Sequence, residues 1–94
     1  MNNYFEEVTS NLSFTDLSIL GHLADHEANT LFKSIKKKVV QDVLKLTEAN
    51  LRKSLYRLQA LKFIVIETSE KEHSVYITNF GQQALYISFS EEVE

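Results

Sequence analysis

The clearest periodic pattern in the chain lies between residues 47 and 61. The residues of one face recur every three or four positions, and they are Leu51, Leu55, Leu58 and Leu61. This spacing predicts an α-helix that packs its leucine face into a core and leaves its polar face for solvent or a partner. Thr47 is a good N-cap for this helix, and Glu48 lies near its positive end.

Three further segments have helical spacing. Ser13, with Asp16 three residues later, forms an N-terminal capping signal, and the apolar residues after it predict a helix to about Asp25. A final helix is expected over residues 79–89. Between these lies a short predicted helix over residues 36–45, with one apolar side formed by Val39, Val40, Val43 and Leu44.

The remaining segments predict strands and loops. Residues 63–68 are rich in β-branched side chains, and residues 74–78 alternate, so both are expected to be strands. The polar residues 69–73 between them predict a hairpin loop. Residues 25–29 are expected to form a loop, and the weak alternation over residues 30–34 indicates a short strand.

The order of these elements is helix, short strand, helix, helix, strand, loop, strand, helix. Two stretches within it resemble the winged helix-turn-helix proteins of the MarR and PadR groups. One is Leu46-Thr47-Glu48-Ala49-Asn50-Leu51, which continues to Phe63-Ile64 like a recognition helix followed by the first strand of a wing. The other matches the pattern Y-x-T-x-x-G-x-x-x-L through Tyr76, Thr78, Gly81 and Leu85. The resemblance implies an α+β winged helix with a three-helix core, a wing of two or three strands and a C-terminal helix.

The bulk composition agrees with one small domain over residues 1–94, with an N-terminal segment at 1–12 and an acidic tail at 90–94. Of the 94 residues, 44% are hydrophobic, which is enough for a core but only a small one. The absence of Cys excludes disulfides and thiolate metal sites. No signal-peptide pattern and no apolar run of roughly 20 residues occurs, so a cytoplasmic location without a membrane is expected.

Charge is distributed very unevenly along the chain. The formal net charge is −3, yet between residues 33 and 62 nine cationic residues face two acidic ones, a local charge of +7. The other residues hold one lysine against eleven acids, a charge of −10. Because local potential decides where a polyanion binds, the basic segment indicates a nucleic-acid surface rather than merely solvated helices.

The winged-helix resemblance assigns roles to the basic segment. The start of the recognition helix would meet base edges in the major groove, and the residues placed there are Thr47, Glu48, Ala49, Asn50, Arg52 and Lys53. Tyr56 and Arg57, one turn later, are expected near phosphates, as are the three lysines that start the preceding helix, Lys36, Lys37 and Lys38. The wing tip has only one reliable cation, Lys71, flanked by Glu70 and Glu72. Lys71 is therefore expected along the DNA backbone or against a neighbouring protomer rather than in the minor groove.

Other chemistry has little support in the sequence. His22 and His26 are four residues apart on one helical face, but a third metal ligand is not evident, so no metal site is predicted. No nucleophile motif and no glycine-rich phosphate loop occurs, and no enzyme activity or cofactor is expected.

The two ends of the chain predict a homodimer. The last helix, capped by Thr78 or Asn79, has more apolar residues than one stripe requires, and the N-terminal segment adds a few more. The residues expected at the dimer seam are Tyr4, Phe5, Val8, Leu85, Tyr86 and Phe89. A two-fold dimer would present two recognition helices to a pseudo-palindromic double-stranded DNA site.

Three functions are consistent with these features. The leading one is sequence-specific DNA binding by a transcriptional regulator. The second is a centromere-binding adaptor of a plasmid partition system, because small winged-helix proteins of the TubR kind have this minimal domain; that resemblance implies cooperative dimers on repeated DNA sites and a tubulin-like filament protein as partner. The third is a winged helix that binds only proteins, which predicts no salt-sensitive DNA binding.

Overall fold

The computed structural model describes residue 7, residues 11–68 and residues 72–93, the last five as backbone alone. Its helices and strands are α2 (Phe14–Asp25), β1 (Ile35–Lys36), α3 (Lys37–Leu44), α4 (Glu48–Ala60), β2 (Ile64–Thr68), β3 (His73–Ile77) and α5 (Asn79–Val93). The strand β3 lies in the middle of a three-stranded sheet and pairs antiparallel with β1 on one side and β2 on the other. This arrangement is the predicted α+β winged helix.

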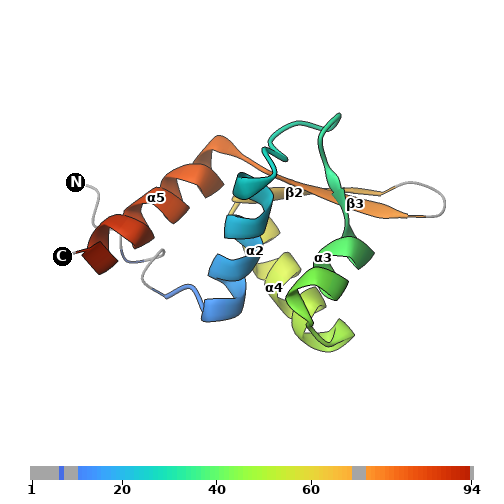
Figure 1. Cartoon of the computed structure of the whole chain (residues 1–94), viewed down its shortest axis with the longest axis horizontal. Helices are drawn as coiled ribbons and strands as arrows, with labels where there is room; N and C mark the ends of the chain where they lie inside the picture. Colours follow the sequence, from blue (N-terminus) through green and yellow to red (C-terminus); the bar gives the residue numbers. More distant parts are fainter. Residues whose placement is uncertain (1–6, 8–10, 69–71, 94) are drawn as a thin grey trace.

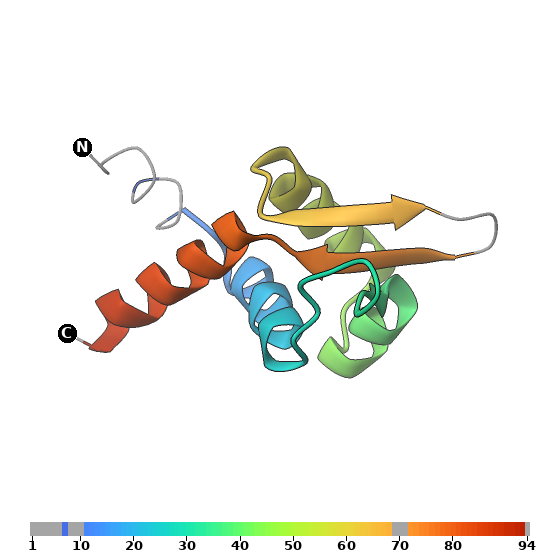
Figure 2. The same ribbon diagram turned by 90° about the horizontal axis from the view of Figure 1, so that it is seen from above.

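The elements are arranged along one long axis, and the molecule measures 42 × 25 × 22 Å. The hairpin of β2 and β3 extends past the helices at one end, and α5 projects at the opposite end (Figures 1 and 2). Helices α2, α3 and α4 lie between them. The wing and the last helix therefore point away from each other, which leaves each with its own surface.

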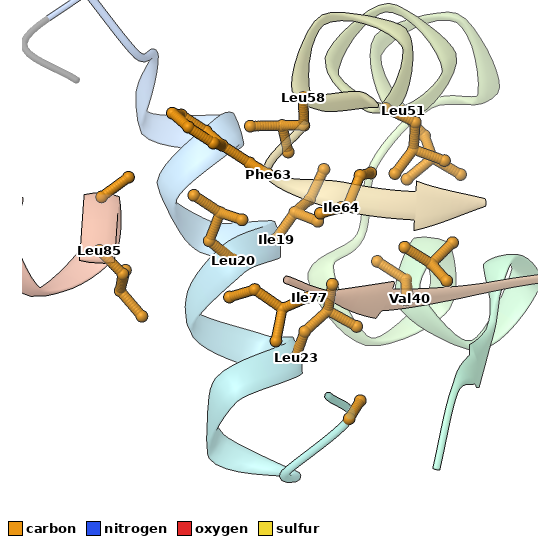
Figure 3. Close-up of a cluster of buried hydrophobic side chains, with 14 residues drawn as sticks. Ile19, Leu20, Leu23, Val40, Leu51, Leu58, Phe63, Ile64, Ile77 and Leu85 are labelled. Atoms are coloured by element: carbon orange, nitrogen blue, oxygen red, sulfur yellow. The ribbon is translucent and has the colours of Figure 1, made fainter. Parts of the chain in front are cut away.

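The hydrophobic core lies where α2, α4 and the wing meet (Figure 3). Its fully buried side chains come from all three, as the periodicity of α4 predicts. They include Ile19, Leu20 and Leu23 from α2, Leu51, Leu55 and Leu58 from α4, and Ile64, Val75 and Ile77 from the wing. Helix α4 is thereby fixed by one face, and its other face remains exposed.

The N-terminus of α2 has the capping box that the sequence predicts. The Ser13 hydroxyl accepts a hydrogen bond from the Asp16 backbone N–H at 3.1 Å, and the Asp16 carboxylate accepts one from the Ser13 N–H at the same distance. The helix ends as predicted at Asp25. Beyond it, the loop is fixed to the sheet because the Ile77 backbone N–H donates to the Ala28 carbonyl at 2.7 Å.

The predicted strand over residues 30–34 is wrong. Those residues form turns, in which the Lys33 backbone N–H donates to the Thr30 carbonyl and the Ser34 N–H to the Leu31 carbonyl. The strand lies one residue later, at Ile35–Lys36, and pairs with Val75 and Ser74 of β3. A two-residue strand leaves almost no alternation in a sequence, because its existence depends on a partner strand about forty residues away.

Helix α3 also differs from its prediction. Lys36 belongs to β1 and is the N-cap of α3, with an extended backbone, so the helix starts at Lys37. Only Val40 is fully buried, whereas Val39 and Val43 are 43% and 55% exposed. The helix is only eight residues long and packs against the core by one narrow edge, so it cannot bury the whole apolar side that its sequence offers.

The link from the wing to α5 explains the threonine and glycine of the sequence pattern. Thr78 caps α5, since its hydroxyl accepts a hydrogen bond from the Gly81 N–H at 3.1 Å and donates one to the Lys62 carbonyl at 2.7 Å. A Cβ atom on Gly81 would lie 2.2 Å from the Phe63 carbonyl oxygen. The first turn of α5 can therefore pack directly on the backbone after α4 only because residue 81 is glycine. The helix continues to Val93, past the predicted end at Phe89.

Candidate DNA-binding surface

The first half of α4 presents a polar face away from the core. The Thr47 hydroxyl accepts a hydrogen bond from the Asn50 backbone N–H at 3.1 Å, which starts the helix at the predicted residue. Leu51, Ser54 and Leu55 are buried, whereas the residues between and just after them, Arg52, Lys53 and Tyr56, are exposed. The exposed residues of this face are Thr47, Glu48, Ala49, Asn50, Arg52, Lys53 and Tyr56. Every residue that the sequence placed at base edges is thus exposed.

Arg52 is positioned along this face by an ion pair within the helix. Its Nη2 atom lies 3.3 Å from Oε2 of Glu48, one turn earlier, and both side chains are more than half exposed. Such an exposed pair adds little to stability. It does hold a guanidinium, which can bind guanine, beside a carboxylate, which can accept from cytosine.

The start of α3 supplies further cations next to this face. One cavity of about 170 Å³ between α3, α4 and the wing is lined by Lys37, Arg52 and Tyr56. Lys37 of α3 therefore meets residues of α4 that lie at least fifteen positions later in the sequence. Lys36 forms an ion pair with Glu72 of the wing at 3.2 Å. Within the described part of the chain, Lys37, Lys38 and Lys53 form no ion pair and remain available to an anion.

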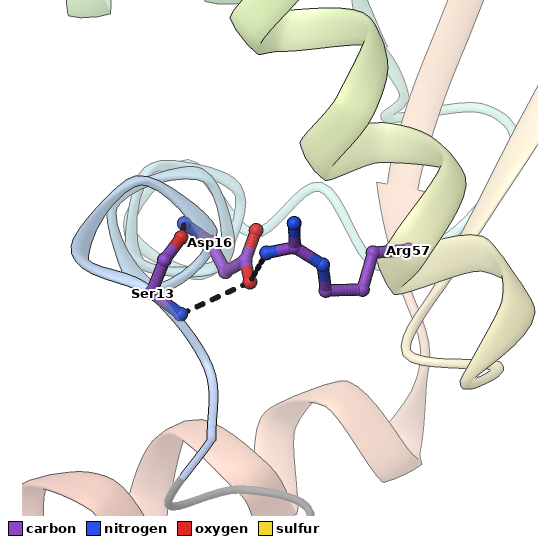
Figure 4. Close-up of polar contacts among 3 residues, drawn as sticks. All are labelled: Ser13, Asp16 and Arg57. Carbon is purple, nitrogen blue, oxygen red and sulfur yellow. Dashed lines mark hydrogen bonds and ion pairs between the residues drawn. The ribbon is translucent and has the colours of Figure 1, made fainter.

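Arg57 has a different environment from the one that the sequence predicts. Its Nη1 atom donates to Oδ2 of Asp16 at 2.7 Å, and the Asp16 side chain is fully buried (Figure 4). The same oxygen accepts the Ser13 backbone N–H, so Arg57 ties α4 to the capped end of α2. The guanidinium is directed to the core side of α4 rather than to its exposed face, because a buried carboxylate requires a charged partner.

The basic segment therefore does not form one surface. Lys36, Lys37, Lys38, Arg52 and Lys53 lie around the start of α3 and the exposed face of α4. Lys33 lies in the loop before β1, where it pairs with Glu27 at 3.7 Å, and Lys62 follows the far end of α4. Lys71, predicted at the wing tip, lies outside the described residues.

Comparison with known proteins identifies winged helices that are similar to this chain. No family model matches the sequence. The DNA-binding protein TubR of Priestia megaterium (strain ATCC 12872 / QMB1551) is 49% identical over 85 residues, which cover 90% of this chain and 84% of the relative. The chain belongs to the TubR family.

Solved structures agree with this assignment. TubR from Bacillus megaterium pBM400 superposes with a TM-score of 0.87 at 47% identity, covering 93% of this chain and 97% of that chain. MarR family regulators share the fold at lower identity: S. aureus MepR, solved with DNA, has a TM-score of 0.73 at 15% identity and covers 94% of this chain and 69% of its own. The TubR relatives carry the name of a DNA-binding protein and not of an enzyme, in line with the expectation of no catalysis.

Of the residues predicted at a dimer seam, Leu85 and Tyr86 have described side chains. Tyr86 of α5 is 73% exposed, and the neighbouring Phe80 is 55% exposed. Leu85 is buried in the core of the protomer and has little surface left for a second copy. Tyr4, Phe5 and Val8, and the side chain of Phe89, lie outside the described part of the structure.

His22 of α2 and His26, the C-cap of that helix, lie side by side with their ring centroids 4.4 Å apart. Burial of the His22 ring lowers its pKa below the usual value; the neighbouring His26 lowers it further, and Asp25 opposes both effects. Among the residues that the structure describes, no cluster of three or more His, Asp or Glu side chains could hold a metal ion. In the same residues, no helix is both long and apolar enough to cross a bilayer.

Sequence analysis did not predict one residue of the candidate DNA-binding surface, His73. His73 was predicted to lie in the hairpin loop, but it is the first residue of β3, pairs with Thr68 and lines the same cavity as Lys37 and Arg52. The signal that could have found it is the strand register. Pairing Ile64 with Ile77, the two buried ends of the hairpin, places Thr68 opposite His73.

Proposed function

We propose that this protein binds double-stranded DNA with the exposed face of α4 and the start of α3. The observation that carries the proposal is the 49% identity to TubR, a DNA-binding protein, together with the surface on which Arg52, Lys53 and Lys37 are exposed or lie at a cavity wall. Exposed cations on a helix that follows a helix-turn-helix corner suit phosphate and base-edge contacts.

The role that the comparisons favour is that of a centromere-binding adaptor in plasmid partition. The chain covers 97% of a TubR structure at 47% identity, whereas its similarity to MarR regulators is at the level of the fold alone. In this role, dimers bind repeated DNA sites and recruit a tubulin-like filament protein. Transcriptional regulation, the first interpretation of the sequence, now has the weaker support.

The proposed dimer uses α5. This helix projects from the body of the protomer (Figures 1 and 2), and its side chains Phe80 and Tyr86 are exposed. Exposed aromatic side chains on a projecting helix are typical of a protein–protein interface. Sedimentation equilibrium would measure the mass, and replacing Tyr86 by Ser should shift the protein toward monomer.

The first test of DNA binding is fluorescence anisotropy with a random duplex of about 25 base pairs, titrated at several salt concentrations. Several phosphate contacts predict an affinity that falls steeply with salt, since each contributes about 0.9 to the log–log slope. Lys53→Ala should weaken binding and lower the slope. Lys33→Ala is the matched control, because it removes one exposed lysine from a loop away from α4.

The outcomes separate the three functions. Absence of binding at low salt would leave a protein-interaction module as the function. Binding without preference for repeated sites from the protein's own replicon would contradict the partition role. Co-pelleting with the tubulin-like GTPase of the same replicon, dependent on that DNA, would support it.

A further inference from the structure

The cavity between α3, α4 and the wing has the chemistry of an anion site. It holds about 170 Å³, and its apolar lining includes Leu55 and Ile66. Polar side chains from three different elements also line it, namely Lys37 of α3, Arg52, Tyr56 and Gln59 of α4, and Thr68 and His73 of the wing. Such a cavity is small enough to hold one phosphate-sized group among several donors.

His73 lines this cavity from the wing side. Its backbone is fixed by pairing with Thr68, the last residue of β2, and its side chain is exposed. The same residue lines a second, more open cavity with Lys36, Lys37 and Lys38. The imidazole therefore lies between the cations of α4 and those at the start of α3.

The charges around His73 come from every neighbouring element. The cations are Lys36 of β1, Lys37 and Lys38 of α3, and Arg52 of α4, and Tyr56 supplies a phenol. Three acids are near. Glu72 precedes His73 in the chain and pairs with Lys36 at 3.2 Å, and Asp42 of α3 lines the more open cavity together with His73. Glu67 of β2 pairs in the ladder with Ser74, one position along the strand. Because strand residues alternate between faces, Glu67 points to the opposite face of the hairpin from Thr68.

We propose that His73, with Lys37 and Arg52, receives one phosphate group of the DNA backbone, and that DNA binding therefore strengthens as His73 gains a proton. The proposal rests on the proposed DNA-binding function and adds to it a contact and a pH dependence. Its occupant is a backbone phosphate because the cavity adjoins the exposed face of α4, which would lie in the major groove beside the backbone.

The physical basis is linkage between proton and DNA. Histidine side chains change charge between pH 5 and 8, the range in which no other neighbour of this cavity ordinarily titrates. A phosphate between His73, Lys37 and Arg52 would attract a positively charged imidazole, because opposite charges attract strongly at short range. DNA then favours proton uptake, and by reciprocity the proton favours DNA.

The test measures anisotropy with a random 25-base-pair duplex, at constant ionic strength, at about pH 6 and about pH 8. Wild-type protein should bind about fivefold more tightly at the lower pH, and the salt slope should rise by about one. His73→Gln should bind equally at both pH values. His73→Lys should bind tightly at both, because its charge does not depend on pH over this range.

His26→Gln is the matched control, since it removes an exposed histidine at the C-terminal end of α2 and should leave the pH response of DNA binding unchanged. Circular dichroism at both pH values establishes that each variant is folded. A pH response that survives in His73→Gln, or equal wild-type affinity at both pH values, would overturn this inference and leave DNA binding intact. A wild-type protein that binds no DNA at either pH would overturn the proposed function as well.

Discussion

Two arginines of α4 lie five residues apart and have different environments. Arg52 is exposed on the outward face and pairs loosely with Glu48, which is itself exposed. Arg57 is only 39% exposed and binds a carboxylate that is fully buried. One therefore belongs to the proposed DNA surface and the other to the packing of α4 on α2.

This difference shows that a run of positive charge is not in itself a binding surface. An α-helix turns about 100° per residue, so Arg52 and Arg57 point in different directions from the helix axis. The neighbours of each arginine decide its role. Arg52 contacts solvent and the exposed Glu48, whereas Arg57 binds the buried Asp16.

The largest expected effect is on stability, from Arg57→Ala. Removing the guanidinium leaves the buried Asp16 carboxylate without its charged partner and should lower the free energy of unfolding by about 2–3 kcal/mol. For a domain of this size, thermal melting should fall by roughly 10–20 °C. The double variant with Asp16→Ala should lose less than the sum of the two single changes, because the pair is coupled. Additive losses would contradict the structural role.

A smaller effect, on binding rather than stability, is expected from Arg52→Ala. Loss of the exposed guanidinium should weaken DNA binding about tenfold, as measured by anisotropy. Melting should change by less than about 3 °C, because the exposed pair with Glu48 contributes little. Lys33→Ala also removes an exposed ion pair, and it should leave DNA affinity within about twofold of wild type. A similar loss in both variants would show that only overall charge matters.

The smallest effect concerns pH and lies on α2. Because burial lowers the pKa of His22 in the folded state, the unfolded chain binds a proton more readily. Stability contributed by the neutral ring is present above the unfolded pKa and is lost as the pH falls through the folded one. Melting should therefore drop by up to about 2 °C between pH 7.5 and 5.5 through this group, and His22→Gln should reduce that drop. An unchanged drop would assign the acid sensitivity to other groups.

The two histidines lie in different regions of the molecule and should respond to acid in opposite ways. On α2, acid pH weakens folding through His22, whereas at the wing it strengthens the proposed DNA contact through His73. The two responses have opposite signs and different readouts. A variant of either histidine should alter one response and leave the other in place.

The order of the helices and of the wing strands could be predicted, because their signals are local. Leucines at helical spacing, the Ser13 and Thr47 caps and the β-branched run at Ile64 each depend on neighbours in the sequence. The same holds for the exposed face of α4, which is fixed once its leucine face is buried. The TubR-like and MarR-like resemblance followed from the same local patterns.

Other features were decided by contacts between distant residues. The strand β1 exists only through pairing with β3, and the exposure of Val39 and Val43 follows from how little of α3 reaches the core. Arg57 is drawn to Asp16, forty-one positions away, and His73 meets Lys37 and Arg52 only where wing and helices converge. The sequence by itself determined which segments fold and which faces are apolar, since both depend on periodicity along the chain. Tertiary structure alone decided which charges are structural and which are free to bind, because the energy of a charge depends on the burial and the partner that only packing supplies.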